Sequence, residues 1–289
     1  MLTRIIIYCF LYPLSLLPLW ILYGIARLMK VVLYYIVRYR RKVVRTNLRN
    51  SFPEKSEKEL LLIEKQYFQH LCNIFIEGVK LLTISKKQLL KRYHCINKDV
   101  VNQYFDKKQS VILLSGHYNN WEWMVLSLDM QFHHHGIGVG KANSNKVFEL
   151  LINKARTRYG TEVVFADTVR QVFENNKANN IPSAYMMLCD QSPANVQKSF
   201  ITTFLHQPSA MIYGGEYFAK KYHYPVFYYS VNQYKRGYYE IELQLICEDA
   251  STEPYGKIIN EYVAHLEKNI NEYPQYWLWS HRRWKHKII

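Results

Sequence analysis

The sequence predicts an α/β fold, a mostly parallel sheet flanked by helices, with an antiparallel hairpin at its edge and an N-terminal membrane-associated helix. Short apolar runs alternate with segments of helical periodicity, which is typical of a parallel sheet. Two longer runs joined through Lys235-Arg236-Gly237 predict the hairpin. Residues 5–26 are uncharged and mostly apolar, long enough for a bilayer core of about 20 residues. The chain of 289 residues is large enough for a substantial core.

The elements follow in order from local signals. Ser56 and Glu59 form a capping-box pattern that opens a long helix ending near residue 82. The continuous apolar run 111–114 suits a strand that is buried on both faces. The predicted strands are 93–96, 111–114, 136–140, 161–165, 184–188, 225–231 and 238–246. The predicted helices after residue 82 are 86–92, 98–106, 121–132, 146–159, 168–179, 210–222 and 255–271.

The net charge of +15 is concentrated at the two ends of the chain. Residues 1–50 contain nine Lys or Arg and no acid, and the last nine residues add four more. Basic residues that flank apolar, aromatic-rich sequence favour an anionic membrane surface as the partner, at about 1 kcal/mol per basic residue, and argue against nucleic acid. We therefore divide the chain into a membrane anchor with a basic segment, residues 1–50, and a second domain, residues 51–289. Pro13 and Pro18 leave open whether the apolar segment spans the membrane or lies in it.

The five cysteines are widely spaced and include no Cys-x-x-Cys pair, which fits a reducing compartment and argues against a zinc site. The run His133-His134-His135 is better explained as a solvated helix end, because consecutive residues point in different directions. We expect no metal and no cofactor.

The strongest chemical motif is His117 followed five residues later by Glu122. His117 should lie just past the carboxyl end of a strand, where open α/β sheets place their chemistry, and Asn120 is a candidate N-cap of the next helix. A carboxylate bonded to one ring nitrogen of a histidine leaves the other nitrogen free to take a proton. His117 is therefore a candidate general base, with Glu122 as its orienting carboxylate.

Several ordered blocks resemble the late acyltransferases of lipid A biosynthesis, within the lysophospholipid acyltransferase superfamily. The blocks are Asn47-Leu48-x-x-Ser51-Phe52-Pro53-Glu54, Gly116-His117-x-x-Asn120-Trp121-Glu122, Arg156-x-Arg158-x-Gly160, Asp190-Gln191 and Trp277-Leu278-Trp279-x-His281-Arg282-Arg283-Trp284-Lys285. Together they cover most of the chain.

The resemblance implies that residues 51–289 transfer an acyl group from an acyl carrier protein thioester to a hydroxyl of a lipid A precursor. His117 and Glu122 would be catalytic, and the substrate-binding residues would be Asn120, Arg156, Arg158 and Asp190. The enzyme would lie on the bacterial inner membrane with this domain facing the cytoplasm.

Two alternatives stay open. The acceptor could be a lysophospholipid or an amino-acid lipid, although superfamily members that acylate glycerol phosphate usually carry Asp at the position of Glu122. The chain could also be a non-catalytic protein of the membrane surface, against which the intact His117 and Glu122 motif speaks.

Overall fold

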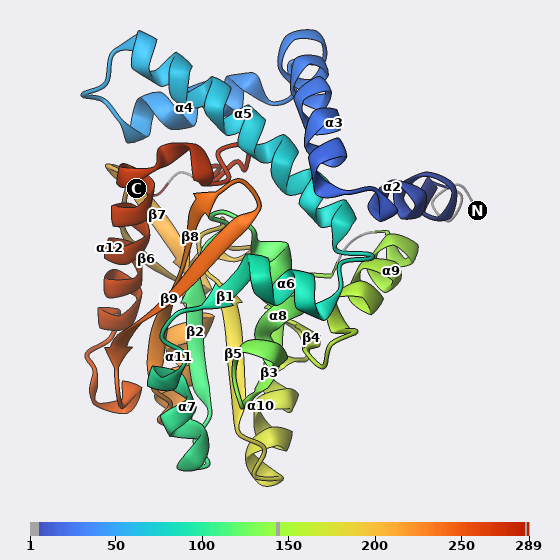
Figure 1. The fold of residues 1–289 in the computed structure, drawn as a ribbon. Helices are drawn as coiled ribbons and strands as arrows, with labels where there is room; N and C mark the ends of the chain where they lie inside the picture. The colour runs from blue at the N-terminus through green and yellow to red at the C-terminus, as the bar shows by residue number, and fades with distance from the viewer. Residues whose placement is uncertain (1–5, 143–144, 287, 289) are drawn as a thin grey trace.

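The computed structural model describes residues 6–142, 145–286 and 288. It confirms the predicted α/β architecture, because a seven-stranded sheet lies between helices (Figure 1). The strand order is β1-β9-β8-β2-β5-β3-β4, and every neighbouring pair is parallel except β8 and β9. The strands are β1 (Tyr93–Cys95), β2 (Val111–Ser115), β3 (His135–Gly140), β4 (Glu162–Phe165), β5 (Ser183–Leu188), β8 (Val226–Lys235) and β9 (Tyr238–Cys247).

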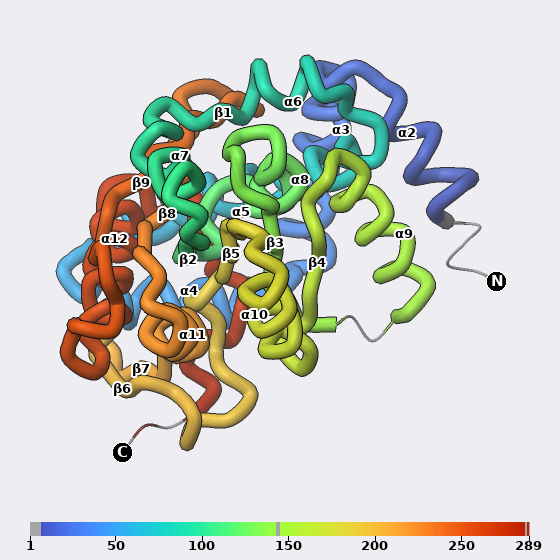
Figure 2. The backbone as a smooth tube through the Cα atoms, turned by 90° about the horizontal axis from the view of Figure 1, so that it is seen from below, coloured from blue at the N-terminus to red at the C-terminus, as the bar shows by residue number. Residues whose placement is uncertain are grey.

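Helices cover both faces of the sheet (Figure 2), with α10, α11 and α12 on one side and α7 and α8 on the other. Strand β2 shows the physical reason. Ile112 and Leu114 pack into the core beneath α12, whereas Val111 and Leu113 pack into the core beneath α8. The bounds are α6 (Lys86–Arg92), α7 (Asp99–Asp106), α8 (Trp121–Gln131), α9 (Lys146–Thr157), α10 (Val169–Ala178), α11 (Gly214–Tyr222) and α12 (Lys257–Glu272), with short turns η3 (Val196–Lys198), η4 (Ala250–Thr252) and η5 (Pro274–Tyr276).

The predicted hairpin is confirmed as β8 and β9, and the short β1 adds beyond it as the edge strand. A second, two-stranded sheet was not predicted. Its strands β6 (Ser199–Phe204) and β7 (Gln207–Ile212) are antiparallel, so the predicted helix 210–222 is wrong over its first residues and begins only at α11. Leu205 and His206 make the connecting turn with positive φ, which a sequence without glycine there does not signal.

The predicted apolar segment 5–26 is not one continuous helix. Elements η1 (Ile6–Leu11) and α2 (Tyr12–Leu16) end before Pro18, and a second helical stretch runs through α3 (Leu19–Val31) and η2 (Val32–Ile36). The stretch Leu19–Ile36 is long and apolar enough to cross a membrane. One side of α3 is buried against the protein, whereas Trp20 and Leu28 on the other side are 75% and 69% exposed.

Helices α4 (Arg41–Ser51) and α5 (Glu57–Lys80) lie across one end of the sheet, above the C-terminal segment (Figure 1). The predicted capping box is confirmed, since Ser56 N donates to Glu59 Oε2 (2.8 Å) and Glu59 N donates to Ser56 Oγ. Asn47 Nδ2 donates to the carbonyl oxygens of Trp279 (2.9 Å) and His281 (3.0 Å). Helix α4 is therefore hydrogen-bonded directly to the C-terminal segment.

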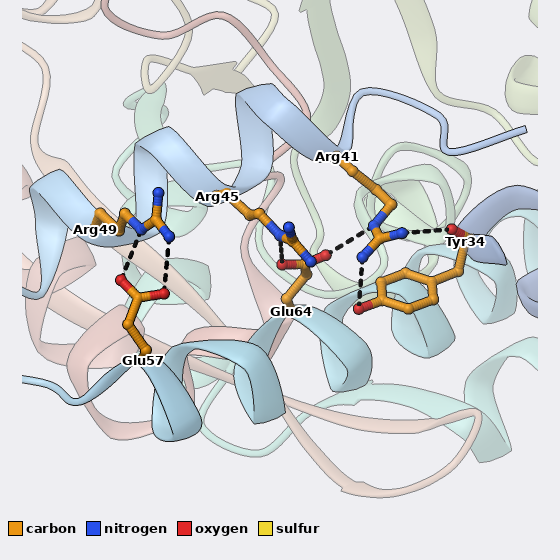
Figure 3. A network of polar contacts seen from close by, with 6 residues as sticks. All are labelled: Tyr34, Arg41, Arg45, Arg49, Glu57 and Glu64. Carbon is orange, nitrogen blue, oxygen red and sulfur yellow. Dashed lines mark hydrogen bonds and ion pairs between the residues drawn. The ribbon is translucent and has the colours of Figure 1, made fainter.

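Two acidic residues of α5 pair with three arginines of the basic segment that the sequence assigned to the membrane (Figure 3). The carboxylate of Glu64 is buried and accepts from Arg41 Nε (3.1 Å) and Arg45 Nε (2.7 Å). Arg49 forms two hydrogen bonds of 2.8 Å with Glu57. These three arginines therefore attach α4 to α5, and their charge is only partly available to an anionic surface.

Candidate active site

His117 lies in the loop between β2 and α8, and the C-terminal segment fixes that loop. Leu278 N donates to the carbonyl oxygen of His117 (3.1 Å), and Asn119 N donates to that of Tyr276 (3.0 Å). Asn119 has a positive φ of 58° and is buried, with its Nδ2 bonded to the carbonyl oxygen of Val231 (2.6 Å). The position of His117 therefore depends on residues more than 100 positions away in the sequence.

The neighbouring strands β2 and β5 bring His117 beside Asp190. Ser115 and Leu188 are register partners at the ends of these parallel strands. His117 lies two residues after Ser115, and Asp190 lies two residues after Leu188. His117 Nδ1 lies 2.7 Å from Asp190 Oδ1, and His117 N donates to Asp190 Oδ2 (2.8 Å). The carboxylate therefore fixes both the backbone and the ring of His117.

Asp190 is buried and remains ionised because its oxygens are fully engaged. Burial alone raises the pKa of Asp190, but the charge of His117, its two hydrogen bonds and a bond from Trp277 Nε1 (2.8 Å) together outweigh burial, so the pKa lies below its ordinary value. An ionised carboxylate requires a proton on His117 Nδ1. When the ring gives up its second proton, Nε2 carries the free lone pair.

The second ring nitrogen of His117 faces Gln191. Gln191 Nε2 lies 3.0 Å from His117 Nε2, which fits an amide N–H donating to the unprotonated nitrogen. The ring of Trp121 lies 5.4 Å away between centroids, and the His117 side chain is 17% exposed. A hydroxyl that gives its proton to Nε2 would take the place of the Gln191 amide.

Glu122 does not orient His117, which corrects the sequence-based assignment. Its carboxylate binds Arg156 in a bidentate ion pair, with Arg156 Nε at 2.9 Å from Oε2 and Nη2 at 2.7 Å from Oε1. Both ring nitrogens of His117 are engaged by other residues. Glu122 instead holds the guanidinium of Arg156, which is 28% exposed and lies on α9.

The structure confirms the prediction that Asn120 is the N-cap of α8, whereas substrate binding by Asn120 stays a prediction. It is completely buried, and its Oδ1 accepts from Trp123 N (2.9 Å). Its Nδ2 donates to Glu77 Oε2 (2.6 Å). Because both ends of this side chain are committed inside the protein, Asn120 belongs to the support of the active-site helix.

Arg158 was also predicted to contact substrate, and its bonds place it in the framework instead. Its terminal nitrogens donate to the carbonyl oxygens of Leu82 (2.7 Å) and Ile84. Its guanidinium lies 4.6 Å from the centre of the Tyr159 ring. Arg158 therefore closes the turn after α5, and Arg156 is the arginine of this block that remains beside the site.

Gln191 and Trp277 were missed as site residues, although both stand in blocks that the sequence singled out. Gln191 directly follows Asp190, and Trp277 belongs to the C-terminal block. Their sequence separations from the residues they contact are 74 and 87, so no local spacing could connect them. Asp190 is predicted as a substrate ligand, and the structure places its carboxylate against His117 and Trp277.

Comparison with known proteins identifies the family of the chain. The sequence model of the bacterial lipid A biosynthesis acyltransferases matches residues 2–286, nearly the whole chain. No curated protein matched the chain. Because the match covers almost the whole chain, including His117, Asp190 and the C-terminal block, the chain belongs to the bacterial lipid A biosynthesis acyltransferase family.

Proposed function

We propose that this lipid A acyltransferase takes its acyl group from an acyl carrier protein thioester and transfers it to a hydroxyl of a membrane-bound lipid A precursor. The observation that carries the proposal is the hydrogen bond between His117 Nδ1 and Asp190 Oδ1, which leaves Nε2 as a base. The chain belongs to a family of acyltransferases, and His117 is oriented so that Nε2 can accept a proton. Both observations support acyl transfer to a hydroxyl.

His117 acts first as a base and then as an acid. The acceptor oxygen attacks the thioester carbonyl carbon while its proton passes to His117 Nε2. The carbonyl then re-forms, the carbon–sulfur bond breaks, and the departing sulfur takes the proton from Nε2. The products are an ester and the free thiol of the carrier. Asp190 stabilises the imidazolium between the two proton transfers, and no covalent enzyme intermediate forms.

Arg156 is the candidate ligand for an anionic group of the acceptor. Glu122 holds two of its nitrogens, and Nη1 faces Asn153 Oδ1 at the long distance of 3.4 Å. A guanidinium fork suits a phosphate oxygen, which lipid A precursors present. We assign Glu122 to the positioning of Arg156, so its contribution to catalysis passes through substrate binding.

The acceptor and the donor can be tested together. We expect lipids from a strain that lacks the gene to contain lipid A without one acyl chain, as measured by mass spectrometry. The purified protein should add the same mass to that lipid when it is given acylated carrier protein, and less efficiently when it is given acyl-coenzyme A.

Unchanged lipid A in the deletion strain would contradict the acceptor, and acylation of a lysophospholipid instead would support the alternative enzyme. Equal kcat/KM with acyl-coenzyme A would contradict the carrier protein as donor. A protein that transfers no acyl group under any condition would favour the non-catalytic alternative.

We further propose that residues 1–50 attach the enzyme to the inner membrane and that residues 51–289 form the acyltransferase domain, on the cytoplasmic side. Support comes from the exposed apolar side of α3 and η2 and from the exposed basic residues Arg38 and Lys42 that follow. The two parts pack against each other, because Leu22 and Val44 of the first part are completely buried in core clusters with residues of the second. Protease treatment of spheroplasts tests the orientation, and cleavage of the catalytic domain from outside would contradict it.

Charging the exposed side of α3 should release the protein from lipid without unfolding it. We expect Trp20→Glu combined with Leu28→Glu to reduce flotation with anionic vesicles strongly, because each charge in an apolar layer costs about 2.5–3.5 kcal/mol. Transfer to acceptor in vesicles should fall more than transfer to acceptor in detergent.

Tyr255→Glu is the matched control, because Tyr255 is 66% exposed but precedes α12 rather than lying on α3. If the α3 variant floats as well as the control, α3 is not the anchor.

A further inference from the structure

Glu77 of α5 is completely buried and bonds to three different parts of the protein. Its Oε1 accepts from Tyr23 Oη (2.7 Å), and its Oε2 accepts from Asn120 Nδ2 (2.6 Å) and Tyr239 Oη (2.7 Å). Tyr23 belongs to the apolar helix α3, Tyr239 to β9, and Asn120 to the start of the active-site helix α8. This carboxylate is not used in the mechanism above.

Glu77 contacts the active-site helix through two routes. Its side chain holds Asn120, whose Oδ1 in turn accepts from Trp123 N at the first turn of α8. Its backbone carbonyl oxygen accepts from Trp123 Nε1 (3.1 Å). The same turn carries Glu122, which binds Arg156, the residue proposed above as a ligand of the acceptor.

Contacts from α5 and from the β8–β9 turn also fix the N-terminal segment that contains α3. Lys80 Nζ, one turn further along α5, donates to the carbonyl oxygens of Ser15 (2.9 Å) and Leu17 (3.1 Å), where the N-terminal segment bends. A Cβ added at Gly237 would lie 2.0 Å from Tyr23 Oη, so the turn between β8 and β9 closes over this hydroxyl. Helix α3 is therefore held in one position relative to Glu77.

The donors around Glu77 require a carboxylate, not merely a polar side chain of this size. Three donors converge on two oxygens, and an ionised carboxylate accepts from all of them without itself donating a proton. Burial raises the pKa of Glu77 to about 7, against the bonds from Tyr23, Tyr239 and Asn120 and the charge of Arg92. Burying the Glu77 carboxylate therefore lowers the free energy of unfolding. An apolar residue of similar size would fill the same space without this cost.

We propose that Glu77 is a positioning residue that joins the apolar helix α3 to the start of α8, so that the active-site corner keeps its reactive geometry only while α3 is seated on α5. The proposal rests on the proposed function for its kinetic part. Its structural part concerns the coupling of two segments and can be measured without any substrate.

The test compares Tyr23→Phe with Tyr34→Phe. Each change removes one hydroxyl from the N-terminal segment where that segment packs on α5, but Tyr34 Oη bonds to Arg41 (3.3 Å; Figure 3), not to Glu77. We expect Tyr23→Phe to lower kcat about tenfold or more, since small displacements of catalytic geometry can cost up to about 10²-fold. Amide hydrogen exchange in residues 121–126 should become faster in Tyr23→Phe and stay unchanged in Tyr34→Phe.

Glu77→Gln gives an independent measurement of the same role. The glutamine keeps the shape but cannot accept from all three donors, so kcat should fall while the KM for the acyl donor stays near that of the wild type. The folded-state pKa of Glu77 lies above its ordinary value of 4.5, so wild-type stability falls as pH rises from about 4.5 to about 7. The variant should therefore gain stability relative to the wild type between pH 5 and pH 8, as measured by denaturant unfolding.

The charged and titratable groups around Glu77 are Tyr23, Tyr239, Arg92 and, beyond Tyr23, Arg236, and none of them changes in the glutamine variant. Wild-type exchange rates in residues 121–126 of Tyr23→Phe, or an unchanged kcat in Glu77→Gln, would overturn the inference. If wild-type protein transfers no acyl group, the proposed function fails, and the exchange result alone then decides whether Glu77 couples the two helices.

Discussion

Replacing His117 by alanine should lower kcat for acyl transfer by about 10²–10⁴-fold, the usual contribution of a general base. The physical reason is the arrangement around the ring: Asp190 fixes the proton on Nδ1, and Nε2 is left to receive the proton of the acceptor hydroxyl. The measurement is the rate of acyl addition to the lipid acceptor at saturating acyl donor.

The matched control is His117→Gln, whose side-chain amide can still donate to Asp190 but has no basic nitrogen. This variant keeps the buried carboxylate partly satisfied, so its stability should suffer less than that of His117→Ala. Both variants should be equally inactive. If either one retains more than about a tenth of the wild-type rate, His117 is not the base, because that loss is smaller than general base catalysis supplies.

Replacing Asp190 by asparagine should be nearly as damaging, by about 10²–10⁴-fold in kcat, because the wrong tautomer of a catalytic histidine is inactive. The asparagine NH₂ would face donors at His117 N, His117 Nδ1 or Trp277 Nε1, which now all bond to carboxylate oxygens. Its amide would favour a ring protonated on Nε2, which cannot accept the proton of the acceptor. Nitrogen NMR of labelled histidine would report this change of tautomer directly.

The variant Glu122→Gln distinguishes the role of Glu122 from that of Asp190. Because Glu122 binds Arg156 and not His117, this change should raise KM for the lipid acceptor more than it lowers kcat, and the His117 tautomer should not change. A larger loss of kcat in Glu122→Gln than in Asp190→Asn would return the orienting role to Glu122.

Local signals in the sequence were sufficient for much of the fold. The run Val111 to Leu114 is apolar at every position and is buried on both faces, as a central parallel strand must be. The Ser56 capping box, the Asn120 cap and the β8–β9 hairpin were predicted from patterns a few residues long, and each is confirmed. Each depends on backbone groups that lie close together in the sequence.

Partners across the sheet could not be predicted in this way. The sequence placed His117 and Asp190 at the ends of two strands, but only the order of the strands makes β2 and β5 neighbours and brings the two side chains together. Without that order, the nearest carboxylate in the sequence, Glu122, was the natural choice. The bonding partners of Arg158 and Asn120 could not be predicted for the same reason, since they lie 43 to 76 residues away, on and after α5.

The sequence by itself determined the fold class, the place of His117 between a strand and a helix, the family and an apolar N-terminal segment. The tertiary structure decided which carboxylate orients the histidine, which arginine stays beside the site, and how α3 is joined to α8 through Glu77. The physical reason is that periodicity and capping act within a few residues, whereas a buried hydrogen bond depends on the register and crossing of elements that are distant in the chain.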